Sequence, residues 1–349
     1  MPDIEWEGEH LRAGGDLEGV CEGNLSYMDA LVGELQQRLG TPGVGLVDFY
    51  YLANGEDELS GHCRADDSHL LVGCTNSRQE VFSVQIPMEH ELVHGVHAEV
   101  GFSHRFLEEG LAEYLGDDGV LPGRGQPMGT VAEALAAATA HGLPLGDYAR
   151  AGHFVAFLDN ELGTNAAMER IDALGFGDSV EKVEVELGRG VEGGFPALDA
   201  AYAAEPACAQ SSYRNAEPMC NVATPLFEQC TSSWDASADV EIDVDCADAA
   251  VLGPRDDEIW TYRTLEVPRA GTYTLLATAQ ADQVAGGLVL KRCAGGCEAA
   301  PIAFSIQRDG DFLLPDDVDL EPGRYLVRLA RPVDEPATIR LRFAGDACE

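Results

Sequence analysis

The sequence predicts an α+β domain followed by an all-β sandwich domain. Apolar residues recur at helical spacing through much of residues 1–205. The composition changes near Glu205, after which prolines, cysteines and small polar residues become frequent. From Val240 onwards, short alternating apolar segments are separated by turn residues, a pattern typical of a β-sandwich. We therefore expect an α+β domain at 1–205, a connector at 206–236 and a sandwich at 237–349.

The first domain should contain several helices and a few short strands. Leu25, Met28, Leu31 and Leu35 follow helical spacing, and a Gly-Thr-Pro segment then ends that helix. In chain order we expect a helix at 24–39, strands at 45–53 and 70–72, and helices at 131–141, 148–161 and 166–174. In the second domain we expect strands at 259–267, 271–277, 287–291, 323–329 and 338–343.

A His-Glu-x-x-His segment, His90 to His94, is the strongest chemical signal in the chain. Residues four apart share a helix face, so His90 and His94 can bind one metal ion while Glu91 flanks it. The surrounding apolar residues would bury these side chains, and burying them unpaired would cost several kcal/mol. A metal ion removes that cost. We expect the helix to span 87–100.

A third metal ligand is expected from a second helix. Gly101 is a plausible terminator of the first helix, and Ser103 a plausible N-cap of the next. Both His94 and Glu109 lie six residues from this turn, or ~9 Å along antiparallel helices, so their side chains can meet. Glu109 is the predicted ligand, with Glu108 and Glu113 as alternatives. Glu113 shares the face of Glu109 and is placed to hold a ligand histidine by its free ring nitrogen.

His97 shares the face of His90 and His94. Three ligands from one straight helix cannot surround a tetrahedral ion, so we expect His97 to support the site rather than bind the metal. A metzincin site would need a histidine six residues after His94, and that residue is Val100.

The segments His90-Glu91-x-x-His94 and Glu109-Gly110-Leu111-Ala112-Glu113-Tyr114 together resemble the gluzincin metallopeptidases, the thermolysin and M1-aminopeptidase superfamily (peptidase MA). The resemblance implies a zincin-like α+β domain with a small sheet ahead of the zinc helix. It also implies one catalytic Zn²⁺ held by His90, His94 and Glu109, with Glu91 as general base.

A third segment, which begins at Tyr148, looks like the M1-type helix whose tyrosine hydroxyl stabilises the oxyanion. The resemblance gives Tyr148 that role, and Arg150 replaces the usual lysine. His153 and His141 are reserve candidates for the same hydrogen bond. All nine histidines fall at or before His153, so histidine-dependent chemistry belongs to the first domain.

The net charge of −39, from 61 acidic and 22 basic residues, disfavours nucleic acid and anionic membranes as partners. It fits general solubility or salt tolerance, and alternatively attraction of basic substrates. We find no apolar run of about twenty residues that could span a membrane.

Ten scattered cysteines suggest disulfides and therefore an oxidising compartment. Short loops suggest two disulfide pairs, Cys63 with Cys74 and Cys293 with Cys297. We expect a secreted or periplasmic bacterial protein whose leader precedes this numbering. Through its segments Trp260-x-Tyr262, Gly271-x-Tyr273 and Gly323-Arg-Tyr325, the second domain is similar to bacterial prepeptidase C-terminal domains, and this resemblance implies a non-catalytic appendage.

The expected function is hydrolysis of peptide or protein substrates by a zinc metallopeptidase. A Gly-x-Met-x-Asn segment, which anchors a free N-terminus in M1 enzymes, is missing upstream, and this favours an endopeptidase over an aminopeptidase. The alternative is a non-catalytic extracellular binding protein built on a gluzincin scaffold. The sequence leaves the oligomeric state open.

Overall fold

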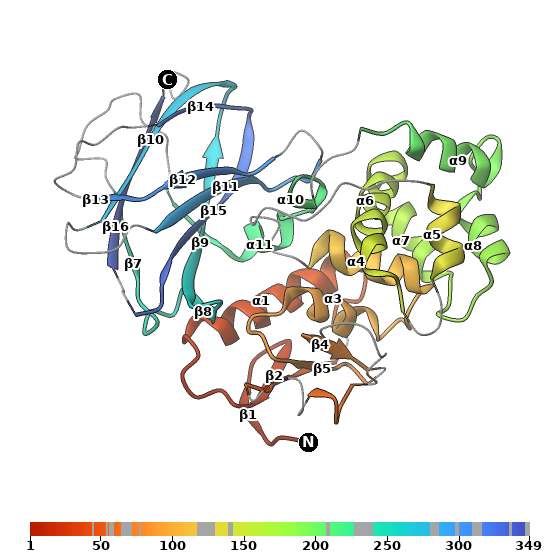
Figure 1. Ribbon diagram of the computed structural model, residues 1–349, viewed down its shortest axis with the longest axis horizontal. Coiled ribbons are helices and arrows are strands. Elements are labelled where there is room, and N and C mark those ends of the chain that lie inside the picture. Colours follow the sequence, from red (N-terminus) through yellow and green to blue (C-terminus); the bar gives the residue numbers. More distant parts are fainter. Residues whose placement is uncertain are drawn as a thin grey trace. The chain divides into compact units, whose positions relative to one another are not determined.

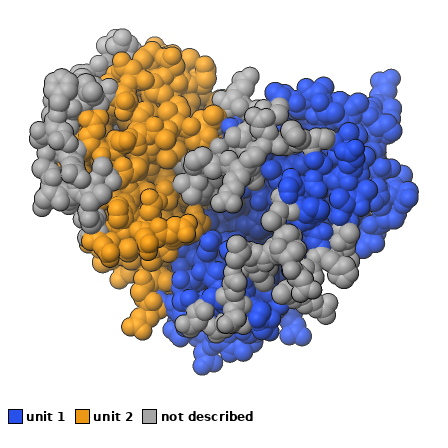
Figure 2. Space-filling view, viewed as in Figure 1, with its two compact units in different colours: residues 1–17, 28–215, 295–299 blue, residues 18–27, 216–294, 300–349 orange. Residues whose placement is uncertain are grey.

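The computed structural model describes residues 1–43, 45–53, 55, 59–63, 72–76, 78–116, 130–138, 142–206, 210–226, 240–279, 286–296, 300–308, 316–334 and 337–345 (Figure 1). The chain forms two compact units (Figure 2). Unit 1 comprises Met1–Leu17, Met28–Asn215 and Gly295–Ala299, and unit 2 comprises Glu18–Tyr27, Ala216–Ala294 and Ala300–Glu349. Unlike the predicted domains, these units are not continuous in sequence: residues 18–27 belong to unit 2 and residues 295–299 to unit 1.

Unit 1 contains a mixed five-stranded sheet in the order β1-β2-β3-β5-β4. Its strands are β1 (Ile4–Glu7), β2 (Leu11–Gly15), β3 (Val47–Tyr51), β4 (Gly73–Thr75) and β5 (Glu80–Ser83). β2, β3 and β5 are parallel, whereas β1 and β4 run antiparallel to their neighbours at the two edges. β3 confirms the strand predicted at 45–53. In the strand predicted at 70–72, Leu70 and Leu71 lie outside the described residues, and β4 begins at Gly73.

Helices make up the rest of unit 1. They are α1 (Gly23–Arg38), whose first turn belongs to unit 2, α3 (Glu89–His97), α4 (Arg105–Leu115), α5 (Val131–Ala137), α6 (Leu145–Leu162), α7 (Thr164–Asp172), α8 (Val180–Leu187), α9 (Gly194–Ala203) and α10 (Gln210–Tyr213). α3 packs against the sheet on one side and against α4 on the other, and α4 packs in turn on α6 (Figure 1). The helices predicted at 24–39, 148–161 and 166–174 are confirmed.

The turn between α3 and α4 brings the two predicted site helices together. α3 is shorter than the predicted 87–100 and ends at His97, and Gly101 follows with a φ of 97°. Ser103 is not the N-cap of α4, because His104 occupies that position. The Ser103 hydroxyl instead donates to the Ile171 carbonyl at 2.7 Å, which ties the turn to α7.

Unit 2 is built from two antiparallel-rich sheets. One sheet has the order β13-β10-β16-β7 with β14 paired to β10, and the other has β12-β11-β15-β9-β6 with β8 paired to β9. The strands are β6 (Thr224–Pro225), β7 (Val240–Val244), β8 (Val251–Arg255), β9 (Glu258–Val267), β10 (Gly271–Ala279), β11 (Gly287–Arg292), β12 (Ile302–Ser305), β13 (Gln307–Arg308), β14 (Asp316–Leu320), β15 (Gly323–Pro332) and β16 (Ala337–Gly345).

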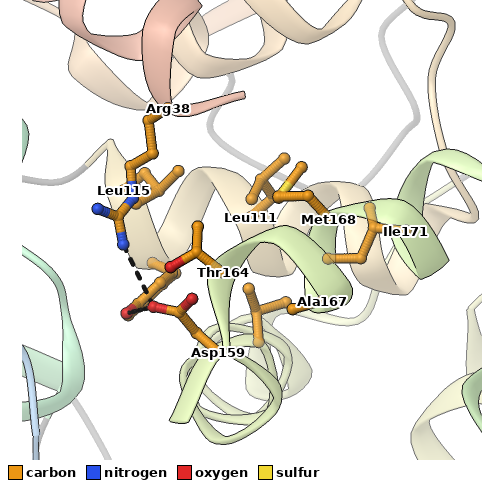
Figure 3. Close-up of a pocket in the computed structure, with 10 residues that line it drawn as sticks. Arg38, Leu111, Leu115, Asp159, Thr164, Ala167, Met168 and Ile171 are labelled. Carbon is orange, nitrogen blue, oxygen red and sulfur yellow. Dashed lines mark hydrogen bonds and ion pairs between the residues drawn. The ribbon is translucent and has the colours of Figure 1, made fainter. Parts of the chain in front are cut away.

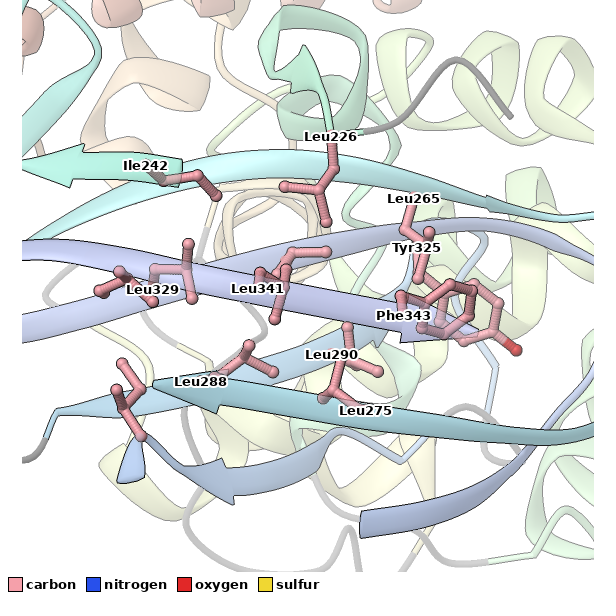
Figure 4. Packing of buried hydrophobic residues seen from close by; sticks show 14 of the residues in the cluster. Leu226, Ile242, Leu265, Leu275, Leu288, Leu290, Tyr325, Leu329, Leu341 and Phe343 are labelled. Atoms are coloured by element: carbon pink, nitrogen blue, oxygen red, sulfur yellow. The ribbon is translucent and has the colours of Figure 1, made fainter. Parts of the chain in front are cut away.

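A single apolar core lies between these sheets, so unit 2 is a β-sandwich, as predicted. Alternate residues of each strand point inward: Leu275 from one sheet, for example, and Leu290 and Leu329 from the other (Figure 4). The Tyr273 and Phe343 rings stack with centroids 5.0 Å apart. All five predicted sandwich strands are present.

Where it is described, the predicted connector at 206–236 is mostly helical rather than extended, with the two-residue strand β6 at its described end. It contains α10 and α11 (Glu217–Val222), the latter packed on β9 and β15. This packing brings Cys220 to Cys293, and the two form a disulfide. The predicted pair Cys293–Cys297 is therefore wrong.

The other described disulfides are Cys63–Cys74, as predicted, and Cys21–Cys246, which links residues 225 positions apart within unit 2. Cys208, Cys230, Cys297 and Cys348 lie outside the described residues. No helix among the described residues is long and apolar enough to cross a membrane.

The sandwich core generates a stability prediction at Leu341, which is fully buried. Leu341→Ala should lower the free energy of unfolding of unit 2 by about 2–5 kcal/mol, because it removes apolar contacts and leaves a cavity. Urea unfolding followed by tryptophan fluorescence would measure the loss. Arg340→Ala, on the exposed face of the same strand, is the control and should cost no more than about 1 kcal/mol.

Candidate metal centre

Three side chains from α3 and α4 converge on one point. Glu109 Oε2 lies 3.2 Å from His90 Nε2 and 3.4 Å from His94 Nε2. In a tetrahedral site with ligands about 2.05 Å from the ion, neighbouring ligand atoms are about 3.3 Å apart. The two contacts match that spacing, and the three ligand atoms lie within 4.8 Å of one another. His90, His94 and Glu109 therefore form a group that can hold a metal ion.

The second oxygen of Glu109 is engaged elsewhere. Oε1 lies 2.8 Å from Nη2 of Arg105, one turn earlier on α4. Only Oε2 thus faces the imidazoles, and Glu109 presents a single oxygen to the group.

Glu108 lies behind the metal group and does not join it. Its Oε1 accepts from His94 Nδ1 at 2.9 Å, so Glu108 and Glu109 contact opposite nitrogens of the same ring. This bond fixes the His94 tautomer with Nε2 directed toward Glu109. As a predicted alternative ligand, Glu108 is thus in the wrong place, because its carboxylate already orients a ligand histidine.

His97 extends this support, as the prediction of a supporting role requires. Its Nδ1 lies 2.7 Å from Glu108 Oε2, and its Nε2 lies 3.1 Å from Asp172 on α7. The Ser103 amide also donates to Glu108 Oε2, at 2.9 Å. Glu108 therefore has three partners, and the chain of contacts from His94 ends at the partly exposed Asp172.

Burial and hydrogen bonding shift the pKa values of Glu108 and His97 in opposite directions. Burial disfavours the Glu108 carboxylate, but hydrogen bonds from His94 and His97 outweigh it and lower the pKa of Glu108 to about 2. Burial likewise disfavours a charged His97, but hydrogen bonds to Asp172 and Glu108 raise the pKa of His97 to about 9. The pair is therefore ionised at neutral pH.

The pKa values of the candidate ligands Glu109 and His94 are also shifted. Burial opposes ionisation of Glu109, but the neighbouring His94 charge and hydrogen bonds from both histidines hold the Glu109 pKa well below its usual value. Burial likewise opposes the charged form of His94, but Glu109 and Glu108 raise the His94 pKa well above its usual value. A metal ion would displace these protons, so its affinity should fall in acid.

Glu113 lies on the other side of the group, near His90. Its Oε1 is 3.9 Å from His90 Nδ1, which is longer than a hydrogen bond. Its Oε2 accepts from the buried Arg214, whose Nε also donates to the Glu113 carbonyl at 3.1 Å. Arg214 thus fixes the carboxylate on the side of His90 away from Glu109.

Glu91 and the edge strand β4 form one wall of the site. Glu91 Oε2 accepts a 2.9 Å hydrogen bond from the Thr75 hydroxyl. Gly73 permits this approach, because a Cβ at that position would lie 2.7 Å from the Glu91 Cγ. Among the described residues β4 pairs only with β5, so it is an edge strand, and the Thr75 hydrogen bond places it beside Glu91.

Tyr148, near the start of α6, also reaches the group. Its ring centroid lies 6.3 Å from that of His90. Burial raises the Tyr148 pKa, and the Glu109 charge raises it further, although Arg105 opposes both. The hydroxyl therefore stays protonated at neutral pH and can donate a hydrogen bond.

The reserve candidates for the Tyr148 role do not join the site. His153 is buried against Tyr202 and Tyr213, and its Nδ1 lies 3.2 Å from the Tyr202 hydroxyl. His153 therefore packs in the helical core, and none of these contacts joins it to the metal group. Arg150 forms an ion pair with Asp147 at 3.0 Å, and His141 lies outside the described residues.

Sequence reasoning missed Arg105, Thr75, Arg214 and Asp172. Each contacts a predicted site residue from another turn or another element, and none carries a recognisable motif. Arg105 had the only readable signal, since it lies four residues before Glu109, where ion pairs form on a helix.

A second concavity lies on the opposite side of α4. It is small and mostly apolar, lined by Leu111 and Leu115 together with Met168 and Ile171 of α7 (Figure 3). At one end Asp159 pairs with Arg38 and accepts from the Tyr114 hydroxyl at 2.6 Å. These polar groups satisfy one another, so the concavity offers no reactive group.

Comparison with known proteins assigns no family. No protein-family model and no curated protein matches the chain. A family 35 carbohydrate binding module from an environmental isolate covers 36% of this chain and 85% of its own, at 14% identity and a TM-score of 0.21. The family 35 module of Cellvibrio japonicus Abf62 covers 37% of this chain and 91% of its own, at 15% identity and 0.19.

A Paenibacillus cycloisomaltooligosaccharide glucanotransferase covers 95% of this chain and 57% of its own, at 12% identity and a TM-score of 0.18. TM-scores this low carry no functional argument. The function must therefore be inferred from the geometry of the site.

The metal group predicts one divalent ion per chain. His94→Ala removes one ligand and should weaken zinc affinity at least about 100-fold. Elemental analysis after dialysis, with competition against a chromogenic chelator, would measure this. His10→Ala, whose ring contacts Gln36 rather than the group, should keep the wild-type metal content. A wild-type protein that takes up no metal would contradict the site.

The Glu108–His97 pair predicts a pH-dependent contribution to stability. The depressed Glu108 pKa stabilises the fold above about pH 4.5 and loses effect as pH falls through about 2. The raised His97 pKa stabilises it below about pH 6.5 and loses effect as pH rises through about 9. In chelator, His97→Gln should therefore cost about 3 kcal/mol near pH 5.5 and clearly less above pH 9.

Urea unfolding of wild type and variant at both pH values would give the difference. Asp172→Asn, which removes only the partly exposed partner, should cost less near pH 5.5. A cost of His97→Gln that is equal at both pH values would show that the pair does not ionise as described.

Proposed function

We propose that this protein is an exported zinc metallopeptidase of the gluzincin type and that it acts as an endopeptidase. The observation that carries this proposal is the Glu109 carboxylate oxygen at 3.2 and 3.4 Å from the two histidines, with Glu91 alongside. Two imidazoles and one carboxylate leave one position of a tetrahedral ion open, which is typical of catalytic zinc. A closed structural site would use four protein ligands.

Zinc is the metal that this donor set favours, because imidazole nitrogens with one carboxylate oxygen suit its borderline softness and tetrahedral preference. When bound, zinc polarises a carbonyl and lowers the pKa of water. His90, His94 and Glu109 would hold it, with Glu108 orienting His94.

Glu91 is the proposed general base. It lies close enough to both histidines to influence their pKa values, and the Thr75 hydroxyl holds one of its oxygens. Its other oxygen can accept a proton from the attacking water and return that proton to the leaving amine.

Tyr148 is the proposed oxyanion donor. Its hydroxyl is protonated at neutral pH, and its ring lies beside that of His90. A hydrogen bond from such a donor is worth about 3 kcal/mol at comparable sites.

The presence of the edge strand β4 supports the proposal that the substrate is a peptide. An extended chain could add to β4 by main-chain hydrogen bonds, which would carry its scissile carbonyl past Glu91. Three disulfides among the described residues fit an oxidising compartment, which supports export.

The proposal is tested by Glu91→Gln. The amide keeps the size of the side chain but cannot accept the proton, so kcat should fall by at least about 10²-fold. Cleavage of casein and of a quenched peptide library would be measured at matched zinc content. Glu99→Gln, at the end of the same segment and away from the group, is the control and should keep full activity.

Full activity of Glu91→Gln would refute the base assignment. A wild-type protein that binds zinc yet cleaves no peptide, with or without chelator, would refute the peptidase proposal. That outcome would favour the alternative of a binding protein on this scaffold.

A further inference from the structure

Arg105 contacts the metal-ligand candidate Glu109 and also lies near Tyr148. Its Nη2 lies 2.8 Å from Glu109 Oε1, and its guanidinium lies near enough to the Tyr148 hydroxyl to act on it as a hydrogen-bond donor. The Phe176 ring lies under the guanidinium, 5.8 Å away. The side chain is 32% exposed, so it is anchored but reachable by solvent.

The contact with Glu109 limits how this carboxylate can bind a metal. A carboxylate can offer one oxygen or two to an ion, and the second mode adds a ligand. Since Arg105 occupies Oε1, only Oε2 remains for the ion. The guanidinium thus favours a three-ligand site with an open position.

A donor-only cation beside Tyr148 favours one orientation of its hydroxyl. A guanidinium has donors only, so in a hydrogen bond with it Tyr148 is the acceptor and keeps its own proton for another acceptor. When substrate is bound, that proton is available to the oxygen that develops negative charge during hydrolysis.

The guanidinium is held at this place by its partners. Its Nε is buried without a hydrogen-bond partner among the described residues. An unpaired buried donor costs stability. The hydrogen bonding of Nε therefore does not explain where the Arg105 side chain lies. Glu109, Tyr148 and Phe176 together determine it.

We infer that Arg105 is a positioning residue that keeps Glu109 as a one-oxygen metal ligand and aims the Tyr148 proton at the reacting carbonyl. The inference rests on the proposed function for its catalytic half. Its metal half stands on the ligand geometry alone.

The test replaces zinc by Co²⁺ and compares wild type with Arg105→Gln and Arg105→Lys. Four-coordinate Co²⁺ absorbs visible light more strongly than five-coordinate Co²⁺, so the spectrum reports the number of ligands. Arg105→Gln should release Oε1, weaken the cobalt absorption and raise the Kd for Co²⁺ about 10-fold. Arg105→Lys keeps the charge and should give an intermediate spectrum.

Steady-state kinetics test the catalytic half of the inference, the orientation of the Tyr148 hydroxyl. Arg105→Gln should lower kcat about 10²-fold with KM changed less than about threefold, because the lost interaction acts in the transition state. With Tyr148→Phe as background, the same change should lower kcat far less, since Arg105 acts through the absent hydroxyl.

Arg12→Gln is the matched control. Arg12 pairs with Asp48 at 2.7 Å and is 38% exposed, similar to Arg105, but its pair lies on β2 and β3. It should leave spectrum, affinity and kcat unchanged. Thermal unfolding of each variant verifies that it is folded.

Arg105→Gln with wild-type spectrum, Kd and kcat would overturn the inference. A wild-type protein that binds Co²⁺ but cleaves nothing would remove the proposed function and the catalytic half, while the spectrum still decides the metal half. A wild-type protein that takes up no Co²⁺ would overturn both halves.

Discussion

The site depends on one shared contact, the Glu109 oxygen that lies between the two imidazoles of α3. It requires α4 to return alongside α3 after a short turn, at a height that sets Glu109 opposite His90 and His94. The Ser103–Ile171 hydrogen bond and the packing of α4 on α6 hold that return in place. A shift of one residue along α4 would point the carboxylate elsewhere.

Around this contact, several buried charges are held by opposite partners. Consecutive glutamates contact opposite nitrogens of His94, Arg105 holds the free oxygen of Glu109, and Arg214 holds Glu113. Buried charges are costly unless they are paired, so removing one partner exposes another. The preorganised array leaves the ligand atoms little freedom, which is what a catalytic metal site needs.

Much of the fold could be read from local pattern. Helical spacing located α1, α6 and α7, and period-two alternation located five of the sandwich strands, β9, β10, β11, β15 and β16, since each pattern reports one face against a core. Strands β1, β2 and β5 were not predicted, because they are short and their apolar residues are too few to show a period. Cys293 was paired with the wrong partner, because Cys220 is distant in sequence and reaches it only through the packing of α11.

The sequence by itself determined the His-Glu-x-x-His helix, the glutamate-bearing helix after it and the separation of a histidine-containing domain from a sandwich. Those features follow from spacing along one chain segment. Only the tertiary structure decided that Glu108 supports His94 rather than binding the ion, that Thr75 contacts Glu91, and that Arg105 holds the second oxygen of Glu109. Such roles depend on which oxygen or nitrogen faces which neighbour, and that is set by packing between elements far apart in sequence.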